Sequence, residues 1–399
     1  MAPFTLKWGI LATGGIATTF SKDLLTDASI RGTTDVRHEV VAAASSSSKD
    51  RAEKFLKEVG AGPDAKAYGS YAELVADPNV DVIYVATPHS HHFQNVMLAL
   101  EVGNKNVLCE KAFTVTAAQA HKLVATARAK NLFLMEAVWT RYFPLSVQIR
   151  DIVSSGGIGT VYRVTADNSL NRNIDHTPNS LIDFPDSNRM VNPDLAGGAL
   201  LDLGIYSLTW LFQILYHLQP EAEGQKEAPQ VLAAINKYDR TGADESTTVV
   251  LNFPKHRSQG IATTSMRVGT GVNDDQKSVP AILIQGSAGE IQVRGPAYQP
   301  TQYRVLKTED KNDSASVPWI SVKIPADSNK VGHGMFWEAD EVARCLRDGK
   351  KESATLPLSE SLVIMETMDS ALKQGGIVYP ELITTDVYDK NSPLNTGNA

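Results

Sequence analysis

The first 140 or so residues alternate between short apolar runs and segments with helical periodicity, and this alternation limits the fold more than any other feature of the sequence. The apolar runs cover residues 6–12, 38–45, 81–87, 106–109 and 132–136. In the clearest helical segment, Phe93, Val96, Met97 and Leu100 recur at i, i+3, i+4 and i+7. Short buried strands joined by amphipathic helices predict a doubly wound parallel sheet covered on both faces. The strands of such a sheet end at one edge, where ligands bind.

The pattern changes near residue 155, where strand-like segments follow one another with few helices between them. These segments cover residues 160–169, 230–237, 247–253, 260–267, 281–285, 290–294, 303–307 and 319–324. They predict an α+β domain with a large, mainly antiparallel open sheet. We therefore predict one domain over residues 1–155 and a second over 156–399. One helical pattern, residues 197–217, interrupts the strands, and the polar stretch before it, residues 171–194, has the length of a functional loop.

Composition excludes several classes of protein. The 399 residues carry a net charge of −7 without a cluster of Lys and Arg, so we expect no nucleic-acid partner. We see no secretory signal and no apolar stretch near the roughly 20 residues that span a bilayer, so we expect no membrane partner. Two cysteines, Cys109 and Cys345, in a chain of this size indicate buried thiols in a reducing compartment. We expect a cytoplasmic protein.

The turn after the first predicted strand fits a dinucleotide site of the Rossmann type. Its residues are Ala12, Gly14, Gly15, Ile16 and Ala17. Gly14 lets the backbone approach a pyrophosphate, and the small Ala17 lets the following helix lie close to the strand. Ala12 stands where the usual pattern has Gly, so an ordinary strand–helix turn is the alternative. The position at the first strand of the alternating pattern favours cofactor binding.

The end of the second predicted strand indicates which nicotinamide cofactor binds. NAD sites place a carboxylate there to hold the ribose 2′-hydroxyl. This chain instead has hydroxyls and cations, at Ser45, Ser46, Ser47, Lys49 and Arg51. These groups suit a 2′-phosphate, so we predict NADP rather than NAD. The alternative is a solvated turn that begins a helix.

Two further strand ends carry polar groups. After the third predicted strand, the loop contains Thr87, Pro88, His89, His91 and His92. The histidines suggest a metal, but no carboxylate or cysteine stands beside them at ligand spacing, so we predict contact with the cofactor and no metal. The next strand ends in Glu110 and Lys111, at the same edge of the sheet.

An acid and a phenol lie one turn apart in the long helical pattern. Asp202 and Tyr206 are at i and i+4, so they share a helix face. A tyrosine is a poor base at neutral pH because its ordinary pKa is about 10. An ammonium such as that of Lys111 lowers the pKa of a nearby phenol, which suits removal of a proton from an alcohol as hydride leaves. The alternative is a structural Asp and a core Tyr.

These motifs together resemble the glucose–fructose oxidoreductase / inositol dehydrogenase / MocA-like oxidoreductases. The resemblance rests on residues 9–17, 87–92, 110–111 and 197–206, in the family's order and spacing, and covers nearly the whole chain. Residues 134–144 and 189–198 are similar to the dimeric dihydrodiol dehydrogenase branch, and most of all to its fungal-type NADP-dependent D-xylose 1-dehydrogenases. Tyr206 agrees with that branch, since many other members have His there. Ala112 departs from the family, which usually has Pro after the Glu-Lys pair.

The resemblance implies roles for individual residues. It implies that Lys111 and Tyr206 are catalytic, with Asp202 supporting them beside the sugar. It also implies that Trp139 and Arg141 reach the nicotinamide or the sugar, although packing is the alternative for Trp139. Arg189 and Asn192 become candidate substrate contacts, with an ordinary surface position as the alternative. The second domain would then bind substrate and form a homodimer through its open sheet.

The implied reaction is NADP-dependent oxidation of D-xylose at C1 to D-xylono-1,5-lactone, with Tyr206 as general base assisted by Lys111. A second possibility is a trans-1,2-dihydrobenzene-1,2-diol dehydrogenase or dicarbonyl reductase. A third, of a different class, is a sensor that binds NADP(H) without turnover. The acid, lysine and tyrosine argue against the sensor, because it needs no proton-transfer groups.

Overall fold

The computed structural model describes residues 2–175, 177, 180–220, 226–271, 279–312, 315–327 and 330–396. The chain forms two compact units, each built from more than one segment. The first unit comprises Met1–Trp139, Ile324–Leu362 and Glu381–Ala399, and the second comprises Thr140–Lys323 and Val363–Pro380. The prediction of one domain over residues 1–155 and a second over 156–399 assumed that the chain passes only once from one domain to the other. These domain limits stay a prediction.

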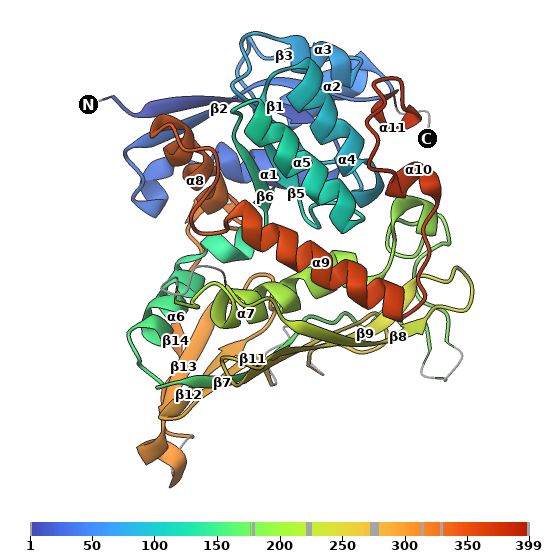
Figure 1. Cartoon of the computed structure of the whole chain (residues 1–399). Coiled ribbons are helices and arrows are strands. Elements are labelled where there is room, and N and C mark those ends of the chain that lie inside the picture. Colours follow the sequence, from blue (N-terminus) through green and yellow to red (C-terminus); the bar gives the residue numbers. More distant parts are fainter. Residues whose placement is uncertain are drawn as a thin grey trace. The chain divides into compact units, whose positions relative to one another are not determined.

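A parallel sheet of six strands forms the core of the first unit, in the order β3-β2-β1-β4-β5-β6 (Figure 1). The strands are β1 (Phe4–Leu11), β2 (Val36–Ala44), β3 (Lys66–Tyr68), β4 (Val82–Val85), β5 (Asn106–Glu110) and β6 (Leu134–Ala137). The predicted doubly wound sheet is confirmed. β3 has no counterpart in the prediction, because three partly exposed residues carry no measurable apolar period.

Helices connect these strands and begin where the sequence supplies caps. They are α1 (Gly15–Leu24), η1 (Ala28–Arg31), α2 (Lys49–Val59), α3 (Tyr71–Ala76), α4 (His89–Met97), the π turn η2 (Leu98–Val102) and α5 (Ala117–Ala129). The Ser48 hydroxyl caps α2 and the Ser70 hydroxyl caps α3. Thr116 and Gln119 form a capping box at α5. α1 and α4 have no side-chain cap.

The C-terminal part of the chain completes the first unit. α8 (Phe336–Arg347), α10 (Glu381–Thr384), α11 (Pro393–Thr396) and the pair β15 (Ala326–Asp327) and β16 (Lys330–Val331) belong to it. Side-chain amides of the N-terminal helices hold this segment: Asn95 Nδ2 donates to Leu394 O at 3.0 Å, and Gln119 Nε2 donates to Ile383 O at 2.9 Å. α9 (Leu358–Gln374) begins in the first unit and continues in the second.

A buried polar network joins α8 to the start of the first unit. The Asp340 carboxylate accepts two hydrogen bonds from the Arg31 guanidinium, each at 2.9 Å, and one from the Thr33 hydroxyl. The Trp8 indole N–H donates to His38 Nδ1 at 3.2 Å, so the other ring nitrogen, Nε2, carries the proton and donates to Asp340 at 2.9 Å. Burial alone would raise the pKa of Asp340, but the hydrogen bonds from His38 and Arg31 lower it to about 2.

The second unit has an eight-stranded sheet in the order β14-β13-β12-β11-β7-β10-β9-β8. Its strands are β7 (Val161–Asp167), β8 (Gln230–Lys237), β9 (Asp244–Phe253), β10 (Ser258–Ser265), β11 (Pro280–Gly286), β12 (Gly289–Arg294), β13 (Gln302–Lys307) and β14 (Ile320–Ser321). All neighbours are antiparallel except β7 and β10. The predicted fold class is confirmed. Besides α6 (Pro144–Ser154), the unit contains α7 (Ile205–Leu215), which lies on β7 and β10 (Figure 1).

The helix predicted over residues 197–217 consists of two pieces, the π turn η5 (Leu200–Gly204) and α7. The 3₁₀ turn η4 (Pro193–Leu195) precedes them. The expectation that no apolar segment has the length of a membrane span was also wrong. Pro193–Leu215 has that length and composition, but 94% of its most apolar stretch is buried inside the protein, as in the core helix of a globular unit.

Candidate active site

The edge of the parallel sheet between β1 and β4 is where the chain's winding reverses, and such edges bind dinucleotides. α1 begins here at Gly14, which provides no side-chain cap, and no acid stands in its first turn. A Cβ added at Gly14 or Gly15 would meet no atom within 4 Å, so open space lies over both residues. Ala12 turns the chain with a φ of +86°, which replaces the missing glycine of the usual pattern. The uncapped amides and the space above them fit a pyrophosphate.

The predicted 2′-phosphate residues lie at the end of β2. Ser45 is buried and its hydroxyl contacts the Ser47 hydroxyl at 3.1 Å. Ser48 turns inward to cap α2 by accepting from the Arg51 N–H. The side chains of Lys49 and Arg51 are exposed on the first turn of α2. The described residues therefore gather hydroxyls and two cations at the strand end, with no carboxylate before Asp50.

The loop after β4 contains a buried hydroxyl, that of Thr87, and a buried histidine, His92, that contacts two backbone carbonyls. The Thr87 hydroxyl is buried and has no hydrogen-bond partner among the described residues. A bound ligand could supply that partner. His92 is fully buried, and its ring nitrogens lie 2.9 Å from Thr87 O and 2.8 Å from Ala112 O. Burial lowers the pKa of His92 to about 4, so the neutral ring has one N–H for these two carbonyls.

His92 therefore links the β4 loop to the Lys111–Ala112 segment. His89, also buried, meets the His92 ring edge to face at 5.6 Å, and Pro88 precedes α4. Among the described residues no group of three or more His, Cys, Asp or Glu side chains could hold a metal ion. The predicted contact of His89 and His92 with the cofactor stays a prediction.

Glu110 and Lys111 stand at the end of β5. The buried Glu110 carboxylate accepts from the Tyr84 hydroxyl at 2.5 Å and from the Lys111 backbone N–H at 3.1 Å. Tyr84 is itself stacked on Phe20 of α1, with ring centroids 3.8 Å apart. Glu110 therefore fixes the backbone from which the Lys111 side chain extends. The peptide bond from Lys111 to Ala112 is cis although Ala replaces the family's usual Pro.

Trp139 and Arg141 lie in the 3₁₀ turn η3 (Trp139–Tyr142), where the chain passes from the first unit to the second. Trp139 is buried and Arg141 is completely buried. The Arg141 carbonyl accepts a hydrogen bond from Arg150 at 3.0 Å. The burial of Trp139 agrees with the packing alternative as well as with a contact to ligand.

The second unit brings together Asp202, Arg189 and Tyr206, which the sequence separates by up to 17 positions. Asp202 lies in the π turn η5 and Tyr206 in the first turn of α7, and both are buried. Asp202 Oδ1 accepts from Arg189 Nη1 at 2.9 Å, with the Arg189 side chain 52% exposed. The Arg189–Asp202 ion pair therefore joins the loop that carries Arg189 to the segment that carries Tyr206.

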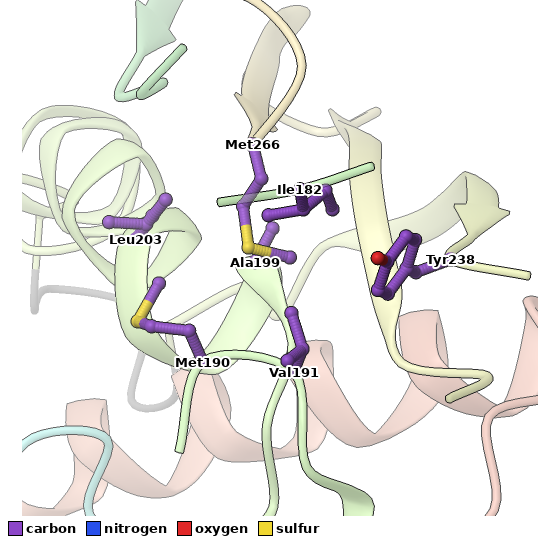
Figure 2. Close-up of a cluster of buried hydrophobic side chains, with 7 residues drawn as sticks. All are labelled: Ile182, Met190, Val191, Ala199, Leu203, Tyr238 and Met266. Carbon is purple, nitrogen blue, oxygen red and sulfur yellow. The ribbon is translucent and has the colours of Figure 1, made fainter. Parts of the chain in front are cut away.

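A hydrophobic cluster holds the Arg189 loop against the π turn. It contains Ile182, Met190, Val191, Ala199, Leu203, Tyr238 and Met266 (Figure 2). Met190 and Val191 directly follow Arg189, while Ala199 and Leu203 flank Asp202. Packing of these neighbours therefore sets the distance between Arg189 and Asp202. Residues 176, 178 and 179 of the predicted loop lie outside the described residues.

Two other residues have contacts that the sequence did not indicate. The Asn192 side chain, predicted to contact substrate, accepts from the Asp194 N–H at 3.0 Å and so caps η4. Tyr298, which the sequence did not single out, places its ring 5.8 Å from that of Tyr206. The Thr140 hydroxyl and the Trp210 indole N–H hold the Tyr298 segment by donating to Tyr298 O and Ala297 O. No sequence signal marks Tyr298, since it lies in a loop between two strands.

Comparison with protein families identifies both parts of the chain. Residues 6–138 match an oxidoreductase family with an NAD-binding Rossmann fold. Residues 146–292 match the GFO/IDH/MocA C-terminal domain. Together the two matches cover the parallel sheet and most of the antiparallel sheet.

Among curated proteins, the chain is 65% identical over 398 residues to a D-xylose 1-dehydrogenase (NADP(+)) of Hypocrea jecorina, covering 99% of this chain and 98% of that protein. It is 36% identical over 377 residues to the human trans-1,2-dihydrobenzene-1,2-diol dehydrogenase, covering 94% and 98%. Among solved structures, a levoglucosan dehydrogenase in complex with NADH and levoglucosan matches with a TM-score of 0.76, 16% identity and coverage of 93% and 97%. A 3-ketoreductase from Actinomadura kijaniata matches with 0.70, 21% identity and coverage of 93% and 98%. These two structures share the fold.

Proposed function

Because the chain belongs to the GFO/IDH/MocA family of oxidoreductases, we propose that it oxidises D-xylose, as the pyranose, at C1 to D-xylono-1,5-lactone with NADP+ as cofactor. The observation that carries this proposal is the 65% identity, over nearly the full length of both chains, to a protein named as an NADP+-dependent D-xylose 1-dehydrogenase. The predicted resemblance to this family is confirmed.

Residues of the first unit would hold the cofactor. The uncapped amides at Gly14 and Gly15 suit its pyrophosphate, and the unpartnered Thr87 hydroxyl is a further donor at the same edge. Ser46, Ser47 and Arg51 would hold the 2′-phosphate that distinguishes NADP from NAD. NADP+, when bound, accepts the hydride that leaves C1 of the sugar.

Tyr206 is the proposed general base. As C1 loses hydride, the C1 hydroxyl must lose its proton so that the carbonyl bond of the lactone can form, and the Tyr206 oxygen takes that proton. An ordinary phenol, with a pKa of about 10, needs a nearby cation to do this at neutral pH, and we assign that role to Lys111. Asp202, paired with Arg189, accepts hydrogen bonds from sugar hydroxyls and orients the ring.

A substrate panel tests the proposed reaction. Purified protein is mixed with several pentoses, hexoses and a trans-dihydrodiol, with NADP+ and NAD+ side by side, while the absorbance of NADPH or NADH is followed. We expect the highest kcat/KM for D-xylose with NADP+. Absence of cofactor reduction with every aldose would contradict the proposal.

A variant pair tests the role of Tyr206. Tyr206→Phe should lower kcat by about 10²–10⁴-fold, the usual contribution of a general base, while KM for NADP+ stays near the wild-type value. Tyr216→Phe is the matched control, because Tyr216 is a buried tyrosine at the end of the same helix. Full activity in Tyr206→Phe would rule out Tyr206 as the general base. The proposed oxidation of D-xylose would then use another base.

The human relative supports a second candidate substrate. That protein is named as a trans-1,2-dihydrobenzene-1,2-diol dehydrogenase and is 36% identical to this chain. A dihydrodiol also presents a secondary hydroxyl from which hydride and proton leave, so Tyr206 would serve in the same way. A kcat/KM for the dihydrodiol above that for D-xylose, in the panel above, would favour this candidate.

We also propose a cytosolic homodimer that contacts through the antiparallel sheet. A Cβ at Gly260 would meet Leu211 of α7, so the sheet face of Gly260 is the one that α7 covers. Successive side chains of a strand point to opposite faces, so Ile261, next to Gly260, points to the other face. Its neighbours across the strands on that face include Leu232, Val250 and Leu283, which are also apolar. Leu232 is 66% exposed. Light scattering of wild type and Leu232→Asp tests this, with a dimer expected for wild type and a monomer for the variant.

A further inference from the structure

Asp244, at the start of β9, is a buried acid that contacts the segment bearing Asp202 and Tyr206. It is completely buried. Its Oδ2 accepts from the Leu200 backbone N–H at 2.6 Å and from the Thr247 hydroxyl at 3.0 Å. Burial raises the pKa of Asp244 to about 7, while these hydrogen bonds lower it. Burial of a carboxyl group costs free energy of desolvation, and packing alone gives no reason for an acid at this position.

The Leu200 amide begins the π turn η5, which has no side-chain cap from its own neighbours in sequence. Such turns leave their first amides without an internal partner. Asp244, 44 residues further along the chain, supplies the missing acceptor. A carboxylate here also lies at the amino end of η5, which continues directly into α7, and negative charge is favourable at such an end.

The approach of Asp244 requires a glycine opposite it. Gly198 has a φ of +144°, and a Cβ there would lie 1.8 Å from Asp244 Oδ1. The adjacent Gly197 lies against the loop that carries Arg189, since a Cβ there would lie 2.8 Å from Arg189 O. Tyr379 donates from its hydroxyl to Gly197 O at 3.2 Å. The turn before Asp202 is therefore held between the Arg189 loop and the Asp244 carboxylate.

We propose that Asp244 is a positioning residue, which anchors the first turn of the Asp202–Tyr206 segment and thereby fixes the proton-accepting groups against the substrate. This inference rests on the proposed roles of Asp202 and Tyr206. Asp202 is two residues beyond the amide that Asp244 holds. A shift of that amide is therefore transmitted to Asp202, to its contact with Arg189, and along the helix to Tyr206.

Three variants of the full chain test the inference. Asp244→Ala removes the acceptor and the charge, Asp244→Asn keeps an acceptor for the Leu200 amide without the charge, and Asp239→Asn is the control. Asp239 is an exposed acid of the same unit, five positions before Asp244. The readouts are hydrogen–deuterium exchange of peptides covering residues 197–206, kcat and KM for D-xylose, and KM for NADP+.

We expect Asp244→Ala to exchange about tenfold or more faster in these peptides, the equivalent of one charge-assisted hydrogen bond, with little change in the parallel sheet. Displacement of the reacting groups should lower kcat by about 10²-fold and leave KM for NADP+ unchanged. Asp244→Asn should recover part of both losses, because a neutral acceptor bonds the amide more weakly. Asp239→Asn should match wild type.

Wild-type exchange in Asp244→Ala, or faster exchange with an unchanged kcat, overturns the inference. If Asp244→Ala does not fold, Asp244→Asn decides the inference, since faster exchange of these peptides with an unchanged kcat in that variant is equally contrary. The exchange readout needs no substrate. If wild type oxidises no aldose, the proposed function fails separately, and the kinetic comparison uses the dihydrodiol.

Discussion

Replacing Asp340 with Asn should destabilise the first unit by about 3–5 kcal/mol, the cost of removing one partner from a buried ion pair. The side chains of Asp340 and Arg31 are each 1% exposed, so the Arg31 charge would remain buried without a carboxylate. An Asn side chain also turns an NH₂ group toward donors on Arg31, Thr33 or His38. The pKa of Asp340 agrees in direction, because the hydrogen bonds from His38 and Arg31 lower it despite burial.

Asp35 provides the matched control. It accepts from Arg344 of α8 at 2.9 Å and from Arg347 at 2.8 Å, so it also carries a paired arginine, but its side chain is 41% exposed. Solvent screens such a pair, and Asp35→Asn should cost less than about 1 kcal/mol. The two variants thus differ mainly in the burial of the ion pair.

Thermal unfolding, followed by calorimetry, distinguishes these values. At roughly 2–4 °C for each kcal/mol, Asp340→Asn should lower the midpoint of the first unit by roughly 6–20 °C, and Asp35→Asn by a few degrees at most. A midpoint for Asp340→Asn no lower than that of Asp35→Asn would refute the argument from burial. It would show that the first unit relaxes to hydrate Arg31.

Three further predictions concern pH, backbone and cofactor. Burial lowers the pKa of His38 below 6.5, so the folded chain binds a proton there less readily than the unfolded chain. The free energy of unfolding should therefore fall as the pH drops below 6.5. His38→Gln should weaken this pH dependence in thermal scans. Gly198→Ala should cost about 3 kcal/mol or more through collision with Asp244, whereas Gly242→Ala, with open space around it, should cost about 1 kcal/mol from backbone strain alone. Arg51→Ala should lower kcat/KM for NADP+ about tenfold or more without lowering that for NAD+, and equal loss with both cofactors would contradict a 2′-phosphate contact.

The sequence was sufficient for what depends on local periodicity. The strands at residues 38–45 and 106–109 were recognisable because at least three apolar residues follow one another in each, and they correspond to β2 and β5. β3 was missed because a strand of three residues has no period. The π turn at Leu200–Gly204 was missed because the same spacing of apolar residues fits an unbroken helix.

Contacts between distant segments could not be predicted. His38 and Asp340 are 302 positions apart, and nothing in either neighbourhood indicates the other. The same holds for Asp244, whose partner amide is 44 positions away, and for Tyr298 beside Tyr206. Lys111, Asp202 and Tyr206 were found from local signals, a strand end and a spacing of four residues, together with the resemblance to a known family. Their assignment as catalytic residues stays a prediction until the variants are measured.

The return of the C-terminal segment to the first unit has a consequence for synthesis of the protein. A ribosome releases Arg31 and His38 some 300 residues before it releases Asp340. During translation the nascent N-terminal region therefore contains Arg31 long before its buried partner Asp340 of α8 is made. A gene fragment that stops before residue 336 lacks α8 and should yield an aggregating product.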